Sequence, residues 1–419
     1  MSRVHRNGRL GIGISLVAGA ALAALAAAPA HAEGAKIGLL GGLTGPIAQP
    51  MVHIVKAAEF AIKQVNDQGG ILGGKLSLVL ADSKCDAQSG QAAANKLVNV
   101  DNVTGIVGAM CSGATISAAN AVAVPAGVVM ISPASTSPAI TNLEDKDFVF
   151  RTAPTDAAQG QVLAQALFNQ GVKKVALTYV NNDYGKGLAN HFSTKFKALG
   201  GTIAGEQAHE DKKSSYRSEL ATLSKGGADS LVVIGYPQSS APIIIRQSLE
   251  GGLFKKFVGP EAIFDKSLWT AIGIKNLEGM LYTRPSSPDN PAAAVFEAAF
   301  KAFNEKAVGQ LFTSQTYDAT FMLAIAIQKA GSTDRAKVRD ALRSIANGKG
   351  EKIQPGEWKK AVALIKAGKE IDYAGASGSV DFDSKGDPLA FYNFWQIKDG
   401  KPAVISSWKF ESGNPVQMK

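Results

Sequence analysis

IVGAMCSGATISAANAVAVPAGVVMISPASTSPAI, residues 106–140, is the stretch that indicates the fold most directly. It contains two short apolar runs, 106–110 and 128–131, and a loop of small hydroxyl residues follows each of them. A short apolar run that stops at such a loop is typical of a buried β-strand that leads into a helix. The stretch therefore predicts two β-strands, each followed by a helix, side by side in a parallel sheet.

Both predicted helices begin at residues that favour helix N-termini. Ser112 is placed to cap a helix over 114–124, and Ser137 precedes Pro138, a residue type favoured at the first helical position. Two such N-termini at one edge of a parallel sheet would bring unpaired backbone N–H groups and several hydroxyls together. This arrangement suits a small carboxylate ligand. The alternative is ordinary capping of two helices, since serine is common at N-caps.

The alternation of strand and helix extends along the chain. Strands are also expected at 36–40 and 76–80, and a second series begins after residue 148, where Asp156 is expected to cap a helix through 169. Further strands are expected at 379–382 and 390–397. This pattern predicts an α/β fold with doubly wound parallel sheets. Because 419 residues are too many for one core, we expect two lobes.

The N-terminal segment 1–32 has the features of a secretory signal peptide. It has a basic start with three arginines, an alanine-rich apolar run over 10–28, and the ending Ala30-His31-Ala32, which is typical of a cleavage site. A membrane anchor is the alternative, but no later segment is long and apolar enough to span a bilayer. We therefore expect a periplasmic protein, and we expect it to diffuse freely because no cysteine near the cleavage site could carry a lipid.

The charge of the chain does not indicate a nucleic-acid partner. Loss of the three arginines in 1–32 lowers the formal net charge at pH 7 from +9 to +6. The remaining basic residues are scattered, and pairs such as Lys173-Lys174 and Lys255-Lys256 lack interleaved aromatic residues. We interpret them as solvated surface.

The two cysteines of the chain, Cys85 and Cys111, form an even pair in a chain that carries an export signal. A disulfide between them is the expected state in an oxidising compartment. It would connect the loop after the second strand to the start of the proposed binding loop.

Neither a catalytic centre nor a metal site is indicated. The sequence has no G-x-S-x-G motif, and the histidines after residue 32 (His53, His191 and His209) lack ligand-like spacing. The acidic turn at 383–387 does not match an EF-hand loop. We expect no enzymatic activity, no metal and no cofactor.

The motifs along the chain resemble, in order and spacing, the solute-binding proteins of branched-chain amino acid ABC transporters, the family of leucine/isoleucine/valine-binding proteins. They are Lys36-Ile37-Gly38, Thr44-Gly45-Pro46, Asn66-x-x-Gly69-Gly70-Ile71, Cys85-Asp86, Cys111-Ser112 and Gly259-Pro260-Glu261. The resemblance implies a type I periplasmic-binding-protein-like fold of two lobes joined by three crossovers, with a cleft that closes on one amino acid. It implies a first lobe of 33–153 plus 284–387 and a second of 154–283 plus 388–419.

The resemblance also implies roles for individual residues, carried over by position. Ser112 and Thr136 would bind the ligand carboxylate through their hydroxyls, with backbone N–H groups around Ser135. Tyr184 and Tyr236 would face the ligand from the second lobe, and Glu261 would accept hydrogen bonds from its ammonium group. Met110 and the Gln49-Pro50 turn would enclose the aliphatic side chain; Pro50 stands where the resembled pattern has an aromatic residue, so the pocket would differ in shape.

Three functions remain open at this point. The first is delivery of an aliphatic amino acid to a membrane permease by a monomeric binding protein. The second is the same fold with an aromatic or other organic carboxylate or amide as ligand, for transport or sensing. The third is an enzyme, which the motifs do not support. Tyr184 could instead be a packing residue and Glu261 a surface charge, and the segment 347–378 has no assigned role.

Overall fold

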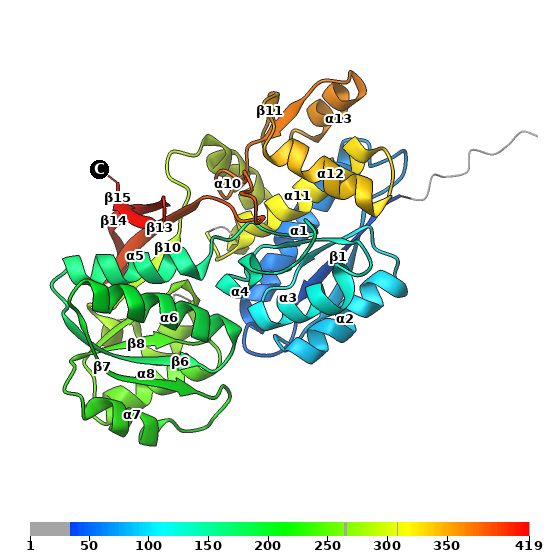
Figure 1. Cartoon of the computed structure of the whole chain (residues 1–419). Helices are drawn as coiled ribbons and strands as arrows, with labels where there is room; N and C mark the ends of the chain where they lie inside the picture. Colours follow the sequence, from blue (N-terminus) through cyan, green and yellow to red (C-terminus); the bar gives the residue numbers. More distant parts are fainter. Residues whose placement is uncertain (1–33, 264–265, 308, 419) are drawn as a thin grey trace, which may run out of the picture.

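The computed structural model describes residues 34–263, 266–307 and 309–418, so the predicted signal peptide lies outside the described residues. Figure 1 shows two groups of elements. One group contains the N-terminal third of the chain together with most of the segment after residue 290, and the other contains the middle of the chain together with the C-terminal strands. We call these groups the first lobe and the second lobe.

The first lobe is built on a five-stranded sheet whose paired strands are all parallel, in the order β2-β1-β3-β4-β5. Its strands are β1 (Lys36–Gly41), β2 (Ser77–Asp82), β3 (Gly105–Gly108), β4 (Val129–Ser132) and β5 (Val149–Arg151). Its helices are α1 (Ala48–Asp67), α2 (Ala87–Asn99), α3 (Ser112–Ala118), α4 (Pro138–Thr141), α10 (Pro291–Asn304), α11 (Thr313–Ala330), α12 (Arg335–Ala346) and α13 (Trp358–Lys366). The two strands predicted within 106–140 are therefore the neighbours β3 and β4.

Alternate residues of these strands enter two different cores because the sheet is covered on both faces. Ile106 and Met130 lie in the core beneath α2 and α3. Val107 and Ile131 lie in the larger core beneath α1 and α11. Burial on both faces explains why the strands are continuous apolar runs and do not alternate with polar residues.

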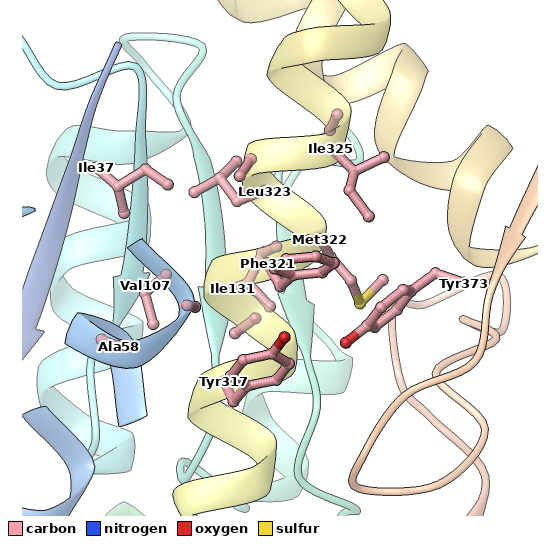
Figure 2. Packing of buried hydrophobic residues seen from close by; sticks show 14 of the residues in the cluster. Ile37, Ala58, Val107, Ile131, Tyr317, Phe321, Met322, Leu323, Ile325 and Tyr373 are labelled. Atoms are coloured by element: carbon pink, nitrogen blue, oxygen red, sulfur yellow. The ribbon is translucent and has the colours of Figure 1, made fainter. Parts of the chain in front are cut away.

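Helix α11 lies at the centre of the larger core. Figure 2 shows Tyr317, Phe321, Met322 and Leu323 of this helix among side chains from α1 and the sheet. A helix that is apolar on all sides is expected to be buried on all sides. The segment 347–378, with the small parallel pair β11 (Glu351–Ile353) and β12 (Ile371–Tyr373), packs on its outer side through Tyr373.

The second lobe is built on an eight-stranded sheet in the order β15-β14-β13-β10-β9-β8-β6-β7. Its strands are β6 (Lys174–Val180), β7 (Thr202–His209), β8 (Ser230–Ile234), β9 (Lys256–Gly259), β10 (Leu281–Pro285), β13 (Ala390–Lys398), β14 (Lys401–Glu411) and β15 (Asn414–Gln417). Its helices are α5 (Asp156–Asn169), α6 (Asp183–Ala198), α7 (Arg217–Ser224), α8 (Ser240–Glu250) and α9 (Lys266–Ile272). The strands from β6 to β10 pair in parallel, whereas β13, β14 and β15 are antiparallel.

The chain passes between the two sheets three times. It leaves the first sheet after β5, leaves the second after β10, and enters the second again at β13. A buried ion pair joins two of these passages: the guanidinium of Arg151 at the end of β5 contacts the carboxylate of Asp387, just before β13, at 2.6 Å. Among the described residues, none of the helices combines the length and hydrophobicity needed to cross a membrane.

Two local predictions were wrong and a third was incomplete. The helix expected over 114–124 begins earlier, at Ser112, and changes after Ala118 to a π-helical turn over Ala119–Ala123. The strand expected at 379–382 is irregular, because the chain there is held by Asn347, whose side chain bonds both backbone groups of Phe382. The strand expected at 390–397 is confirmed as β13, and β14 and β15, which had not been predicted, extend it into an antiparallel sheet.

Candidate ligand-binding site

A cavity of about 70 Å³ lies between the two lobes and is lined by both of them. The first lobe contributes Ile47, Pro50, Ile54, Met110, Cys111, Ser112, Ala134, Thr136, Leu311 and Phe312, and the second contributes Tyr184, Tyr236, Pro237, Glu261 and Ala262. Five of the six residues proposed from the sequence as ligand contacts are in this wall. The sixth, Ser135, is not.

The lobes are in contact beside the cavity, so the structure is a closed form. The Ser137 hydroxyl at the start of α4 donates a hydrogen bond to the Asp183 carbonyl of α6 at 3.0 Å. The side-chain amides of Gln49 and Gln238 are joined at 3.0 Å, and the Gln49 backbone N–H also donates to Gln238 at 3.1 Å. Each of these bonds joins one lobe to the other.

The sequence had predicted Ser112 as the N-cap of α3. Ser112 is instead the first residue of this helix. The N-cap is Cys111, whose side chain cannot cap because it is bonded to Cys85 in the predicted disulfide. The Ser112 hydroxyl is therefore not used by its own helix, and it accepts a hydrogen bond from the Ser137 backbone N–H at 3.2 Å. Its proton can still be donated to a ligand in the cavity. Ser137 caps α4 as predicted, with Pro138 as the first helical residue.

Thr136 lies in the cavity wall, and its hydroxyl donates a hydrogen bond to the carboxylate of Asp156 at 2.9 Å. The sequence prediction of Asp156 as a helix cap was wrong, because Thr155 caps α5 and leaves Asp156 at the first helical position with its carboxylate directed inward. Complete burial, together with the nearby charge of Glu261, raises the pKa of Asp156 well above its ordinary value. Its second oxygen has no hydrogen-bond partner among the described residues.

Ser135 is a structural residue of the loop and not part of the cavity wall. Its hydroxyl contacts the Thr115 hydroxyl at 2.7 Å and donates to the Ala109 carbonyl at 3.1 Å. Its backbone N–H donates to the Ser132 hydroxyl at 3.0 Å. The loop that carries Thr136 is thus fixed from behind by Ser135.

Glu261 supplies a second buried carboxylate, which lines the cavity from the second lobe. Its side chain is 2% exposed and accepts a hydrogen bond from the Gln159 amide of α5. Burial raises the pKa of Glu261 to about 7 despite this bond. The charges of Arg284 and Arg151 lower the pKa of Glu261 and of Asp156 respectively, but burial outweighs them and neither carboxylate has a salt bridge with a described residue. A buried carboxylate without a salt bridge is costly, which favours a cationic group in the cavity.

Tyr184 and Tyr236 form one wall of the second lobe, with stacked rings whose centroids are 5.8 Å apart. The Tyr236 hydroxyl is held by the Asn182 amide at 3.0 Å, whereas the buried Tyr184 hydroxyl has no partner among the described residues. Burial raises the pKa of both phenols, so both remain neutral. Tyr184 therefore keeps a free hydroxyl and Tyr236 presents mainly its ring.

The remaining wall is apolar and comes largely from the first lobe. Pro50 lies in the first turn of α1 and lines the cavity. Leu311 and Phe312 come from the segment before α11, and Phe312 has a left-handed backbone with φ of 60°. A bulky residue in this conformation is unusual, and such strain is concentrated at functional sites.

Two parts of this site were not found from the sequence. Asp156 and Gln159 looked like ordinary residues of a helix start, although Thr155 immediately before them was a signal for an earlier cap. Nothing in the sequence indicated that Leu311 and Phe312 line the cavity. A left-handed backbone conformation at an aromatic residue in a loop has no recognisable sequence pattern. Both pairs are near the cavity only because α5 and α11 are folded toward it.

The site can hold a small molecule with a charged end and an apolar end. Hydroxyl groups and the Glu261 carboxylate line it, with Asp156 behind Thr136, and aliphatic and aromatic side chains form the rest of the wall. Within the described ranges, no three acidic, histidine or cysteine side chains are grouped so that they could hold a metal ion. The wall of the cavity contains no histidine, lysine or arginine. It is suited to binding and not to nucleophilic or acid–base chemistry.

Comparison with known proteins adds an independent observation. The chain matches the periplasmic binding protein family over residues 34–350. It is 33% identical to the leucine-, isoleucine-, valine-, threonine-, and alanine-binding protein of Pseudomonas aeruginosa, over 78% of this chain and 87% of that protein. The crystal structure of a leucine-binding protein from Thermotoga maritima is similar with a TM-score of 0.75 and 25% identity, over 89% of this chain and 98% of that one.

The fold is also shared with proteins that bind other ligands. A solute-binding protein of an ABC transporter from R. palustris, solved in complex with benzoate, has a TM-score of 0.75, and the match covers 92% of this chain and 98% of that one. The two sequences are only 18% identical, so this likeness concerns the fold alone.

Proposed function

The chain belongs to the periplasmic binding protein family, and on this premise we propose that it captures a branched-chain aliphatic amino acid for uptake by an ABC transporter. The observation that carries the proposal is the pair of buried carboxylates, Glu261 and Asp156, whose pKa values burial raises despite the charges of Arg284 and Arg151. An α-ammonium group would supply a salt-bridge partner. A relative named for leucine, isoleucine and valine binding supports the same ligand class.

In the proposed complex the ligand carboxylate lies at the Ser112 hydroxyl and the backbone around Thr136, near the N-termini of α3 and α4. The ammonium group lies at Glu261, with Asp156 behind Thr136 as a second negative charge. The side chain contacts Pro50, Met110 and the other apolar wall residues. Tyr184 donates or accepts one hydrogen bond, and Tyr236 covers the ligand with its ring. No chemical step takes place.

Calorimetric titration with leucine, valine and 4-methylpentanoate tests this function. The last compound has the shape and carboxylate of leucine but no ammonium group. Leucine and valine are expected to bind much more tightly than 4-methylpentanoate, because only the amino acids neutralise Glu261. Equal affinity for leucine and 4-methylpentanoate would contradict the proposal.

The affinity for amino acids should rise with pH through the range just below neutrality. Burial raises the pKa of Glu261 to about 7 in the empty closed cavity, and a neighbouring ammonium group lowers it again. The ligand ammonium keeps its proton in this range, so binding releases the proton of Glu261, and the affinity falls as the pH falls below about 7. Titrations between about pH 5 and pH 8, in two buffers of different ionisation enthalpy, measure both the affinity and the released proton.

The affinity for a simple carboxylic acid should instead fall as the pH rises, because such a ligand binds only while Glu261 remains protonated. Leucine affinity that is constant across this range, or that increases on acidification, would contradict the proposed role of Glu261.

Ligand binding should stabilise the closed form. The proposed contacts come from both lobes and are made together only when the cavity is shut, and we expect the three crossovers near 153–154, 283–284 and 387–388 to bend. Small-angle X-ray scattering should therefore show a smaller radius of gyration with saturating leucine than without ligand. An identical radius in both conditions would indicate that the lobes do not move.

Replacement of Ser112 by alanine should weaken leucine binding by about 1–2 kcal/mol, because one hydroxyl donor is lost while backbone donors remain. Ser117→Ala on the same helix is a matched control, since its hydroxyl contacts Gln91 and not the cavity. The measurement is calorimetric titration, with thermal unfolding to confirm that both variants are folded. If Ser112→Ala binds leucine as tightly as the parent does, the Ser112 hydroxyl does not contact the ligand.

The second candidate ligand class, aromatic or other organic carboxylates and amides, shares the same hydroxyl-lined end of the cavity. The likeness in fold to the benzoate-bound protein supports it, and the two buried carboxylates weigh against it. A thermal-shift screen of amino acids against aromatic acids separates the two.

The cellular setting follows from the family and from the N-terminal sequence. Membership in a periplasmic family supports a periplasmic location and an ABC transporter permease as partner. We propose that residues 1–32 are removed as a signal peptide, that the mature protein is a monomer, and that its lobes comprise 33–153 plus 284–387 and 154–283 plus 388–419.

A further inference from the structure

A second, larger cavity of about 410 Å³ lies between the lobes next to the first. Its first-lobe wall consists of Gln49, Pro50 and His53 at the start of α1, together with Gln310; its second-lobe wall consists of Lys266, Ser267, Thr270 and Ala271 on one face of α9. We call this cavity the outer chamber. It has more room than the ligand cavity and a far more polar wall.

The outer chamber and the ligand cavity share a wall at Pro50, which lines both. The segment 310–312 also runs from one to the other, because Gln310 lines the outer chamber while Leu311 and Phe312 line the ligand cavity. In the proposed complex the aliphatic side chain of the ligand contacts Pro50, which lines both cavities. A ligand with a side chain longer than that of leucine would therefore extend past Pro50 toward the chamber.

The polar atoms of the chamber include unused donors and acceptors. The side-chain N–H groups of Gln49 have no acceptor among the described residues, since only its Oε1 and backbone N–H are engaged by Gln238. The Thr270 hydroxyl donates to the Lys266 carbonyl at 2.9 Å and keeps its acceptor capacity. The Lys266 side chain adds a further donor to this wall. An amide or ureido group matches such a wall, because its oxygen accepts from these donors and its N–H groups donate to Thr270.

We propose that the outer chamber receives the polar end of long, neutral amino acid side chains, so that the protein binds amino acids with a terminal amide or ureido group as well as branched-chain ones. This inference rests on the proposed function, because the amino acid end of the ligand is held at Ser112 and Glu261 in both cases. The aliphatic stem passes Pro50, and the terminal group exchanges hydrogen bonds with Gln49 and Thr270.

Calorimetric titration with leucine and citrulline tests the proposal on the full mature chain and on three variants. Citrulline has a three-carbon stem and a terminal ureido group. The parent protein should bind it within about tenfold of leucine, because two neutral hydrogen bonds offset the smaller apolar contact. Ala271→Trp fills the chamber from an exposed position and should weaken citrulline tenfold or more, while leucine stays within about twofold.

Two further variants separate the chamber from general effects. Thr270→Val keeps the shape of the side chain but removes the acceptor, and should weaken citrulline about threefold to tenfold with leucine unchanged. Ala221→Trp places the same bulky residue at an exposed position of α7, outside both cavities, and should change neither affinity.

Leucine binding without measurable citrulline binding would overturn the inference and leave the proposed function intact. A loss of leucine and citrulline affinity by the same factor in Ala271→Trp would also overturn it, since the chamber would then not act on the long ligand alone. Failure of the parent to bind either amino acid would instead overturn the proposed function.

Discussion

Glu261→Gln is expected to weaken the binding of leucine or valine by about 3–5 kcal/mol, which is more than a hundredfold in affinity. Glutamine keeps the shape of the side chain and can still accept a hydrogen bond from Gln159, so the change removes little except the charge. The ligand ammonium would then be buried without its main counter-ion. Calorimetric titration of both proteins with both amino acids measures the loss.

Glu144→Gln is the matched control for this variant, because Glu144 is exposed in the first lobe and should not affect binding. The same substitution at 261 should not weaken 4-methylpentanoate, since a neutral glutamine removes the repulsion between two carboxylates. If Glu261→Gln binds leucine as tightly as the parent does, the amino acid assignment is wrong.

Arg151→Met is expected to have the largest effect on stability, about 3–5 kcal/mol in the free energy of unfolding. Arg151 is fully buried; its Nε donates to Asp387 at 2.7 Å, and other guanidinium N–H groups donate to the Thr141 hydroxyl at 2.6 Å and the Ser137 carbonyl at 2.9 Å. Methionine would leave the Asp387 carboxylate buried without its partner. Urea unfolding followed by circular dichroism measures the loss.

Arg217→Met is the control, because the ion pair of Arg217 with Glu250 is exposed and should contribute at most about 1 kcal/mol. The double variant Arg151→Met with Asp387→Leu should recover part of the lost stability, since the unpaired charge is then removed. A loss for Arg151→Met no larger than that for Arg217→Met would show that the buried pair does not stabilise the fold.

The Arg151 network also connects the fold to the binding loop. The carbonyls of Ser135 and Ser137 accept from the same guanidinium, and these residues flank Thr136. Loss of Arg151 should therefore weaken ligand binding even where the protein remains folded.

Much of the fold could be predicted because its signals are local. The apolar runs that became β3 and β4, the cap at Ser137 with Pro138 behind it, and the pairing of Cys85 with Cys111 all depend on short patterns in the chain. The resemblance to a family then brought together residues that are distant in sequence. Five of its six proposed ligand contacts lie in one cavity wall.

The rest depends on tertiary structure and leaves no local pattern. A serine at a helix start can cap the helix or face a ligand, and the disulfide at Cys111 decides between these for Ser112. Thr155 and Asp156 both suit an N-cap, and only the packing of α5 shows which carboxylate is buried. The outer chamber requires α1 and α9 to face each other across the lobes, and no segment of the sequence indicates that.

The threefold passage of the chain between the sheets has a consequence for how the molecule assembles. All strands of the first-lobe sheet have been synthesised once the ribosome passes Arg151. However, α11, which buries Val107 and Ile131, begins only at Thr313. In the second lobe, β10 gains its outer neighbour only when β13 begins at Ala390. The core beneath α1 and α11 therefore cannot form until α11 is available, whereas the core beneath α2 and α3 consists only of residues before 150. The larger core depends on contacts between distant parts of the chain, so long loops must close late. For the export that we propose from residues 1–32, this order of assembly would keep the larger core of the first lobe unformed until most of the chain has crossed the membrane.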